Sequence, residues 1–186
     1  MKRKNGPITL LRGQALSRGS ILHPIPPFYD AESRILILGS FPSVKSREQM
    51  FFYGHPQNRF WRVIAEVFGD EIPASIPEKK AFLKKHHIAL WDVIAACEIE
   101  GSSDASIKNV IPTDLSRILD TADICGIFVN GKTAEKYYKK YAEGSINKKA
   151  ICLPSTSPAN AAWRMEALSR AWGEEIRKVY AYEKSE

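Results

Sequence analysis

The sequence predicts an α/β fold of three layers (αβα), with a central four-stranded parallel sheet between two layers of helices. Four short apolar runs, at residues 35–38, 88–93, 124–129 and 150–153, alternate with segments of helical periodicity. This alternation is typical of parallel strands that are joined by helices and buried on both faces. Each run ends in a polar or turn-forming motif, and ligands of open parallel sheets bind outside the carboxyl ends of the strands. We therefore expect the four motifs to line one cleft.

The predicted helices rest on apolar residues spaced three or four apart and on start and stop signals. Pro56 suits the first turn of a helix that ends at Gly69, which would place Asn58 and Arg59 in that first turn. Further helices are expected at residues 77–86, 112–119, 132–141 and 160–180, the last with Trp163, Leu168, Trp172, Ile176 and Val179 on its inner face. The proline-rich residues 23–29 are expected to lie extended along the surface.

Length and charge favour one domain preceded by a basic arm. The 186 residues fit a single domain with a sizeable core, and a content of 44% hydrophobic and 26% charged residues is ordinary for a soluble globular protein. The net charge is +6, and the first 20 residues carry +5 of it because they contain no acid. We therefore expect a flexible basic arm over residues 1–20 and one domain over residues 21–186. Such an arm either binds nucleic-acid phosphate or only aids solubility.

The cysteines and the N-terminal sequence indicate which metal sites and which cellular location are expected. The three cysteines are isolated and lie in or beside apolar runs, so we expect no zinc or iron–sulfur site and no cofactor. Reduced thiols fit an intracellular protein, and neither a signal peptide nor a run of eighteen apolar residues is present. We expect a cytoplasmic monomer with no membrane partner.

Three motifs resemble those of a known family. They are Gly39-Ser40-Phe41-Pro42-Ser43, the segment 53–61 (Tyr-Gly-His-Pro-Gln-Asn-Arg-Phe-Trp) and the segment 155–160 (Ser-Thr-Ser-Pro-Ala-Asn). Together they resemble the uracil-DNA glycosylase superfamily, most closely its hypoxanthine (deoxyinosine) DNA glycosylases and next its mismatch-specific uracil glycosylases. The resemblance implies a DNA glycosylase of base excision repair, which hydrolyses the N-glycosidic bond of a deaminated base. We expect hypoxanthine in DNA to be preferred over uracil or xanthine.

The resemblance implies that Asn58 is the catalytic residue. In the mismatch-specific branch the Asn that positions water lies in the first motif, where this chain has Phe41. The hypoxanthine branch instead uses an Asn of the second motif, and the matching residue of this chain is Asn58. Its carboxamide would accept a hydrogen bond from the attacking water. The alternative is that Asn58 only binds the backbone at the start of a helix.

Base-binding residues are expected at Gly39, Ser40, Phe41, Pro42, Tyr53, His55 and Asp92. The resemblance implies that Tyr53 stacks on the flipped base, although an aromatic residue beside two phenylalanines is also suited to the core. His55 would donate to the substrate, or would only cap the turn before Pro56. Asp92 would accept from a ring N–H, or would be a capping or solvated residue.

Residues that contact the DNA are expected in the third motif and just after it. The resemblance implies that this loop enters the minor groove, with hydroxyls for phosphate and small apolar residues as a wedge. The expected residues are Ser155, Ser157, Pro158, Ala159, Asn160 and Arg164. A plain Ser- and Pro-rich turn is the alternative.

Two other functions stay open at this stage. One is a glycosylase specific for uracil in G:T/U mismatches, and the other is a non-catalytic nucleic-acid-binding protein of the same fold. The nucleotide-binding loops, the paired metal-binding histidines and the nucleophile elbow of other enzyme classes are absent from the sequence. The expected partner in each case is DNA, which contains a deaminated base if the chain is a glycosylase.

The arm gives the first prediction. Deletion of residues 1–20 is expected to weaken DNA binding and to flatten its salt dependence, because these residues hold most of the excess positive charge. The slope of log K against log salt is about −0.9 per phosphate neutralised on B-DNA. Binding isotherms of the full chain and the deletion at several salt concentrations measure this slope. An unchanged slope would show that the folded domain holds the phosphates.

Overall fold

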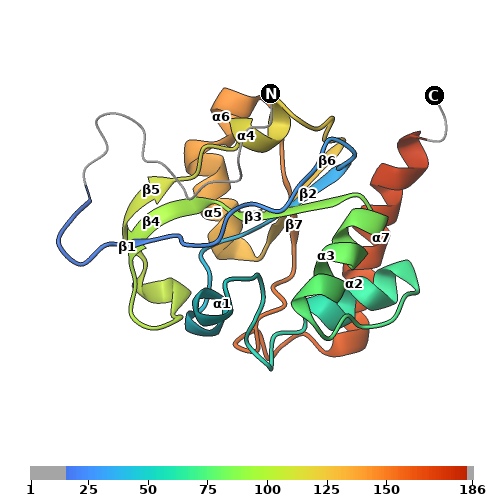
Figure 1. Ribbon diagram of the computed structural model, residues 1–186, viewed down its shortest axis with the longest axis horizontal. Helices are drawn as coiled ribbons and strands as arrows, with labels where there is room; N and C mark the ends of the chain where they lie inside the picture. Colours follow the sequence, from blue (N-terminus) through green and yellow to red (C-terminus); the bar gives the residue numbers. More distant parts are fainter. Residues whose placement is uncertain (1–15, 184–186) are drawn as a thin grey trace.

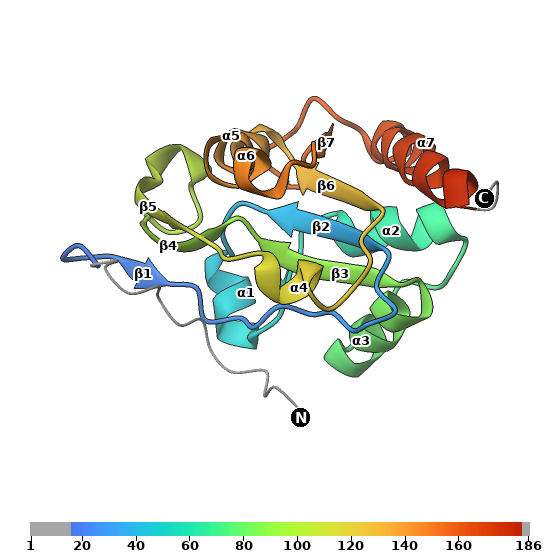
Figure 2. The same ribbon diagram turned by 90° about the horizontal axis from the view of Figure 1, so that it is seen from above.

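Four parallel strands form the central sheet of the computed structural model, which describes residues 16–183. The strands lie in the order β3-β2-β6-β7 (Figure 2), and neighbouring strands pair in parallel. The prediction of a four-stranded parallel sheet is therefore confirmed. The bounds are β2 (Ile35–Gly39), β3 (Ile88–Asp92), β6 (Gly126–Asn130) and β7 (Ile151–Leu153).

The register of these strands brings their polar ends together. Strand β2 lies between β3 and β6, and its four apolar residues, Ile35 to Leu38, are fully buried. Gly39 pairs with Asp92 at the end of β3, and Asn130 at the end of β6 pairs with Leu153. Because the strands are parallel, these carboxyl ends meet at one edge of the sheet.

Helices cover both faces of the sheet and complete the three layers. In Figure 1, α4 and α6 lie on one side of the strands, and α1 and α2 lie on the other. Helix α7 packs against α2, and its buried Trp172 donates from Nε1 to the carbonyl of Pro154 at 2.9 Å. This contact ties α7 to the segment that follows β7. The helices are α1 (Val44–Gln49), α2 (Phe60–Phe68), α3 (Ile76–Lys85), α4 (Ser116–Leu119), α5 (Lys132–Tyr141), α6 (Glu143–Ile146) and α7 (Met165–Glu183).

A second, antiparallel sheet lies beside the first and is absent from the predicted elements. It consists of β1 (Ile21–Leu22), β4 (Ile94–Glu98) and β5 (Lys108–Pro112), in the order β1-β4-β5. The prediction of a helix from residue 112 is wrong, because Pro112 ends β5 and the next N–H, of Thr113, still donates to the carbonyl of Val93 at 3.0 Å. Helix α4 starts only at Ser116.

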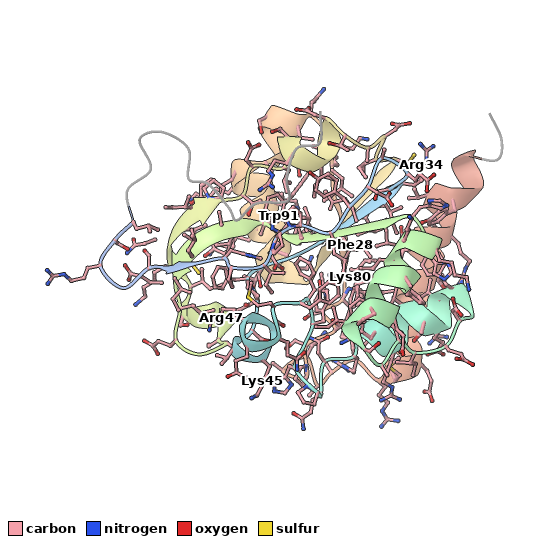
Figure 3. All side chains as sticks on the ribbon, viewed as in Figure 1. Phe28, Arg34, Lys45, Arg47, Lys80 and Trp91 are labelled. Atoms are coloured by element: carbon pink, nitrogen blue, oxygen red, sulfur yellow. The ribbon has the colours of Figure 1, made fainter. Side chains whose placement is uncertain are left out.

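The proline-rich segment 23–29 is extended as predicted, but the prediction that it lies on the surface is wrong. Phe28, labelled beside β3 in Figure 3, exchanges backbone hydrogen bonds with Leu90 of that strand. His23 and Ile25 are each only 1% exposed. Because the side chains of an extended segment alternate in direction, every second one enters the core here. His23 therefore reaches the interior near the end of β3.

Two predicted helix starts are wrong by about one turn. Helix α2 begins at Phe60 with Arg59 as its N-cap, so Asn58 lies in the preceding turn, where its N–H donates to the carbonyl of His55 at 2.9 Å. Helix α7 begins at Met165, so Trp163 precedes it. Trp163 is 37% exposed and does not belong to the inner face predicted for it.

The predicted basic arm lies mostly outside the described residues. Of its charged residues, Lys2, Arg3, Lys4 and Arg12 fall in that part, and Arg18 is described and exposed. None of the helices between residues 16 and 183 has the length and apolar character needed to cross a bilayer.

Candidate active site

A cleft of about 990 Å³ opens at the carboxyl edge of the parallel sheet. The motifs that follow all four strands contribute to it, with Gly39 from β2, Asp92 from β3, Asn130 from β6 and Leu153 from β7. The expectation that the strand ends line one cleft is therefore confirmed.

The cleft brings together every predicted site residue except Arg164, which is exposed just before α7 and does not line it. Their roles remain predictions, whereas their proximity is a feature of the structure. The residues that line the cleft are Gly39, Ser40, Phe41, Pro42, Tyr53, His55, Asn58, Asp92, Ser155, Ser157, Pro158, Ala159 and Asn160.

Asn58 is held rigidly at the wall of the cleft. Its Oδ1 accepts from the backbone N–H of Phe60 at 3.0 Å and from the hydroxyl of Thr156 at 2.9 Å. A backbone N–H can only donate, so these contacts identify the oxygen of the amide. Oδ1 thus binds the first backbone N–H of α2, and no residue between 16 and 183 accepts a hydrogen bond from Nδ2. The amide N–H group is the part of Asn58 that is left for a ligand.

Thr156 and Asn130 connect Asn58 to the end of β6. The amide of Asn130 donates to the Thr156 hydroxyl at 2.9 Å, and the Thr156 backbone N–H donates to Asn130 Oδ1 at 3.0 Å. Thr156 is fully buried, so each of these bonds is shielded from water. Neither residue is among the predicted site residues. The Asn-Gly pair after the third apolar run is the signal that points to Asn130.

Arg59 fixes the loop that follows β7. Its backbone N–H and Nε donate to the carbonyl of Thr156, and Nη2 donates to the carbonyls of Ser157 and Asn160 at 2.7 and 3.0 Å. Nη1 donates to the carbonyl of Trp163. The guanidinium fork matches several acceptors at once because its donors are planar and rigid. We call this set of contacts the Arg59 clamp.

The clamped loop presents an apolar tip. Pro158 and Ala159 are exposed there, whereas Ser155 and Ser157 use their hydroxyl oxygens to accept from the N–H groups of Ser157 and Ala159 at 3.2 and 3.3 Å. The Asn160 amide donates to the Ser155 carbonyl at 2.9 Å. Ser155, Ser157 and Asn160 therefore shape the loop, and each serine keeps a hydroxyl hydrogen to donate.

Tyr53 lines the cleft near Gly39 and has a strained backbone and a buried hydroxyl. Its φ is 52°, and its ring stacks on Phe60 at 3.9 Å. The buried Oη makes no hydrogen bond of normal geometry within residues 16–183, although the side chain of Asn130 lies close enough to lower its pKa slightly. Burial, together with the nearby Asp92 carboxylate, raises the pKa of this phenol well above its usual value. The hydroxyl therefore stays protonated and can donate a hydrogen bond to a ligand.

Asp92 is nearly buried and paired with a residue outside the predicted set. Its Oδ2 lies 2.7 Å from Nε2 of His23, and the two residues are 5% and 1% exposed. His23 escapes sequence reasoning because it lies 69 residues away in a segment assigned to the surface. The ring of Phe41, which is also buried, packs edge-on against His23 at 5.6 Å. Arg47, labelled on α1 in Figure 3, lies over the Phe41 ring, with its guanidinium carbon 5.8 Å from the ring centroid.

A second carboxylate, Asp104, faces the cleft from the loop after β4. It accepts from the Ser40 hydroxyl with both oxygens, at 3.0 and 3.1 Å. Loss of solvation in the cleft raises the pKa of Asp104, and the Asp92 carboxylate adds to the shift. Ser40 is therefore engaged with the protein. His55 accepts from the Gln57 N–H with Nδ1 at 3.2 Å, which leaves Nε2 as its donor.

The fold and the cleft define an α/β protein with a ligand site at the carboxyl edge of a parallel sheet. The family model of the uracil DNA glycosylase superfamily matches residues 26–177, and the chain belongs to this superfamily. The resemblance of the three motifs is thereby confirmed.

Relatives and a solved structure agree with this membership. A hypoxanthine DNA glycosylase of Methanosarcina barkeri is 35% identical over 114 residues, which are 60% of this chain and 72% of the relative. A hypoxanthine DNA glycosylase of Methanosarcina acetivorans is 36% identical over 137 residues, which are 73% and 85% of the two chains. The solution structure of a candidate uracil DNA glycosylase from Methanosarcina acetivorans superposes with a TM-score of 0.72 at 30% identity, covering 84% of this chain and 96% of that one.

The close approach of Gly39 to Asp92 generates a prediction for stability. A Cβ at Gly39 would lie 2.3 Å from Asp92 Oδ1, so Gly39→Ala has to displace the carboxylate from His23. We expect a loss of about 1–3 kcal/mol in the free energy of unfolding, measured by urea denaturation. Gly144→Ala is the matched control, because a Cβ there meets nothing within 4 Å and the residue is helical. Equal stability of both variants would contradict the tight packing at Gly39.

Proposed function

We propose that the protein is a monofunctional DNA glycosylase of base excision repair that removes a deaminated base, with hypoxanthine preferred over uracil or xanthine. Membership of the superfamily supports a glycosylase, and the names of the two relatives support hypoxanthine. The observation that carries the proposal is the placement of the Asn58 amide and the Asp92 carboxylate in one cleft, below a loop with an exposed apolar tip.

The reaction asks for a flipped base, a placed water and room for the leaving group. A cleft of about 990 Å³ admits a purine nucleoside. Pro158 and Ala159 are suited to fill the space that the flipped nucleotide leaves in the duplex. The water oxygen then bonds to C1′ of the sugar, while the bond from C1′ to the base nitrogen breaks and its electron pair leaves with the base. Proton transfer completes the free base and an abasic sugar.

Asn58 is proposed to hold the attacking water through Nδ2. Oδ1 already accepts two hydrogen bonds, so the amide N–H donates to one lone pair of the water and the other lone pair faces the sugar. This differs from the initial expectation that the carboxamide accepts from the water. A water held in this way is a weak nucleophile, which suffices because a loose, cationic transition state needs mainly positioning.

The role of Asn58 gives the next prediction. Asn58→Ala is expected to lower the single-turnover rate of base release by on the order of 10²–10³, as removal of one preorganised polar contact does. Asn58→Asp keeps an oxygen for the Phe60 N–H and the Thr156 hydroxyl but has no donor, so we expect it to fold normally and also lose most of the rate. Near-wild-type turnover in Asn58→Ala would rule out its proposed role. Full activity in Asn58→Asp alone would show that the water is held by an acceptor.

The substrate preference is tested on matched duplexes that differ only in the lesion. We expect hypoxanthine to be released faster than uracil or xanthine under single turnover, partly because the hypoxanthine–thymine pair is weaker than the original pair and costs less to open. The tryptophan fluorescence of Trp163, the one exposed tryptophan of the four, reports DNA binding separately. Faster release of uracil in every pairing context would favour the mismatch-specific alternative. Binding without release of any base would favour the non-catalytic one.

The same assay tests whether the enzyme is monofunctional. Lys132 lines the cleft, and its Nζ is paired with Glu135 at 2.8 Å. An amine nucleophile would form a Schiff base with the sugar and cut the strand without added alkali. We expect strand cleavage only after alkali treatment, and no covalent adduct on reduction with borohydride.

A further inference from the structure

The His23–Asp92 pair has a defined protonation pattern. The backbone N–H of Ile25 donates to Nδ1 of His23 at 3.2 Å, so Nδ1 carries a lone pair rather than a hydrogen. The ring hydrogen is therefore on Nε2, which donates to Asp92 Oδ2 at 2.7 Å. A neutral imidazole that donates requires an accepting carboxylate. Phe41 and Phe52 pack around the His23 ring at 5.6 and 6.5 Å, which excludes water from this hydrogen bond.

Two polar atoms next to this pair make no hydrogen bond of normal geometry with residues 16–183. No residue between 16 and 183 donates a hydrogen bond to Oδ1 of Asp92, which lies 2.3 Å from the point where a Cβ on Gly39 would fall. The buried Oη of Tyr53 lies 3.4 Å from the same point. A buried hydroxyl that makes no hydrogen bond of normal geometry costs free energy, so its presence at the cleft indicates that a ligand supplies the acceptor. The two atoms are thus neighbours, one an acceptor and one a donor.

We propose that His23 positions Asp92 for its expected contact with the ring N–H of a deaminated base, and that the Tyr53 hydroxyl reads the adjacent carbonyl. The inference rests on the proposed function for its substrate and extends it to the atoms that select the base. Tyr53 Oη–H donates to the carbonyl oxygen, and Asp92 Oδ1 accepts from the ring N–H. Charge that develops on that oxygen as the base leaves strengthens the bond from Tyr53.

This arrangement selects the product of deamination over the undamaged base. Adenine has an amino group and a bare ring nitrogen at the positions where hypoxanthine has a carbonyl and an N–H, and cytosine differs from uracil in the same way. A carboxylate that accepts from His23 has no hydrogen to donate to the bare nitrogen, and its oxygen repels the lone pair of that nitrogen. Because His23 occupies Oδ2, a single oxygen faces the base. Tyr53 and Asp92 thus recognise the groups that deamination creates, and they accept both hypoxanthine and uracil.

The tautomer of His23 is tested by nitrogen NMR of histidine-labelled protein. We expect one histidine with a slowly exchanging hydrogen on Nε2 and none on Nδ1, and we expect its shifts to change in Asp92→Asn. A hydrogen on Nδ1, or on both nitrogens, would overturn the proposed pair. This measurement does not depend on glycosylase activity, so it decides the pair even if no base is released.

The reading role is tested by single-turnover release of hypoxanthine. Tyr53→Phe keeps the ring on Phe60 and removes the buried hydroxyl, so we expect a rate about 10- to 100-fold lower with an unchanged or higher melting temperature. A rate equal to wild type would overturn the role of the hydroxyl.

The positioning role of His23 is tested by a double-mutant cycle with Asp92→Asn. His23→Ala is expected to lower the rate about 10- to 100-fold in the wild-type background and about 2-fold or less in Asp92→Asn, because it acts through the carboxylate. His23→Gln, whose amide donates from nearly the same place, is expected to recover most of the rate. Equal losses in both backgrounds would show that His23 only packs in the core. A wild type that releases no base would overturn the proposed function and the reading role together, while the NMR result would still stand.

Discussion

A hydrogen bond between the Thr156 hydroxyl and Asn58 Oδ1 joins two segments that lie 98 residues apart, and the site depends on it. The first segment follows β2 and begins α2, and the second connects β7 to α7. Neither segment has a regular element of its own at this point. The Thr156 hydroxyl, the Asn130 amide and the Arg59 clamp replace the missing backbone pairing. The sheet brings the segments to one edge, and these side chains lock them together.

The electrostatics of the cleft fit a neutral group better than an anionic one. Asp92 and Asp104 both face it, and each carboxylate disfavours further negative charge. A phosphate would therefore be repelled from the floor of the cleft, whereas a neutral base with an N–H would be attracted. Most of the excess of positive over negative charge lies in the first 20 residues instead. The cleft is therefore suited to the base rather than to the phosphates of the DNA.

The sequence predicts the parallel sheet because apolar runs such as residues 35–38 report burial on both faces, whatever their partners are. It also predicts most of the cleft, since residues at strand ends such as Gly39 and Asp92 are placed by the sheet. It fails where long-range contacts override local signals. Pro56 is a good helix start, yet the turn at Asn58 forms because Thr156 and Phe60 donate to it. His23 is missed because its segment is held inward by long-range backbone pairing, of His23 with Ala95 and of Phe28 with Leu90, which the local sequence does not show.

The Arg59 clamp holds the shape of the loop independently of the side chains that the loop carries. All of its bonds to the segment 156–163 end on main-chain carbonyls, which every residue type provides. The side chains at the tip, Pro158 and Ala159, take no part in these contacts and point to solvent. Natural variation or deliberate redesign can therefore replace the tip without rebuilding the loop, provided that Arg59 is retained. The scaffold offers a fixed frame on which different surfaces for contacting a duplex can be exchanged.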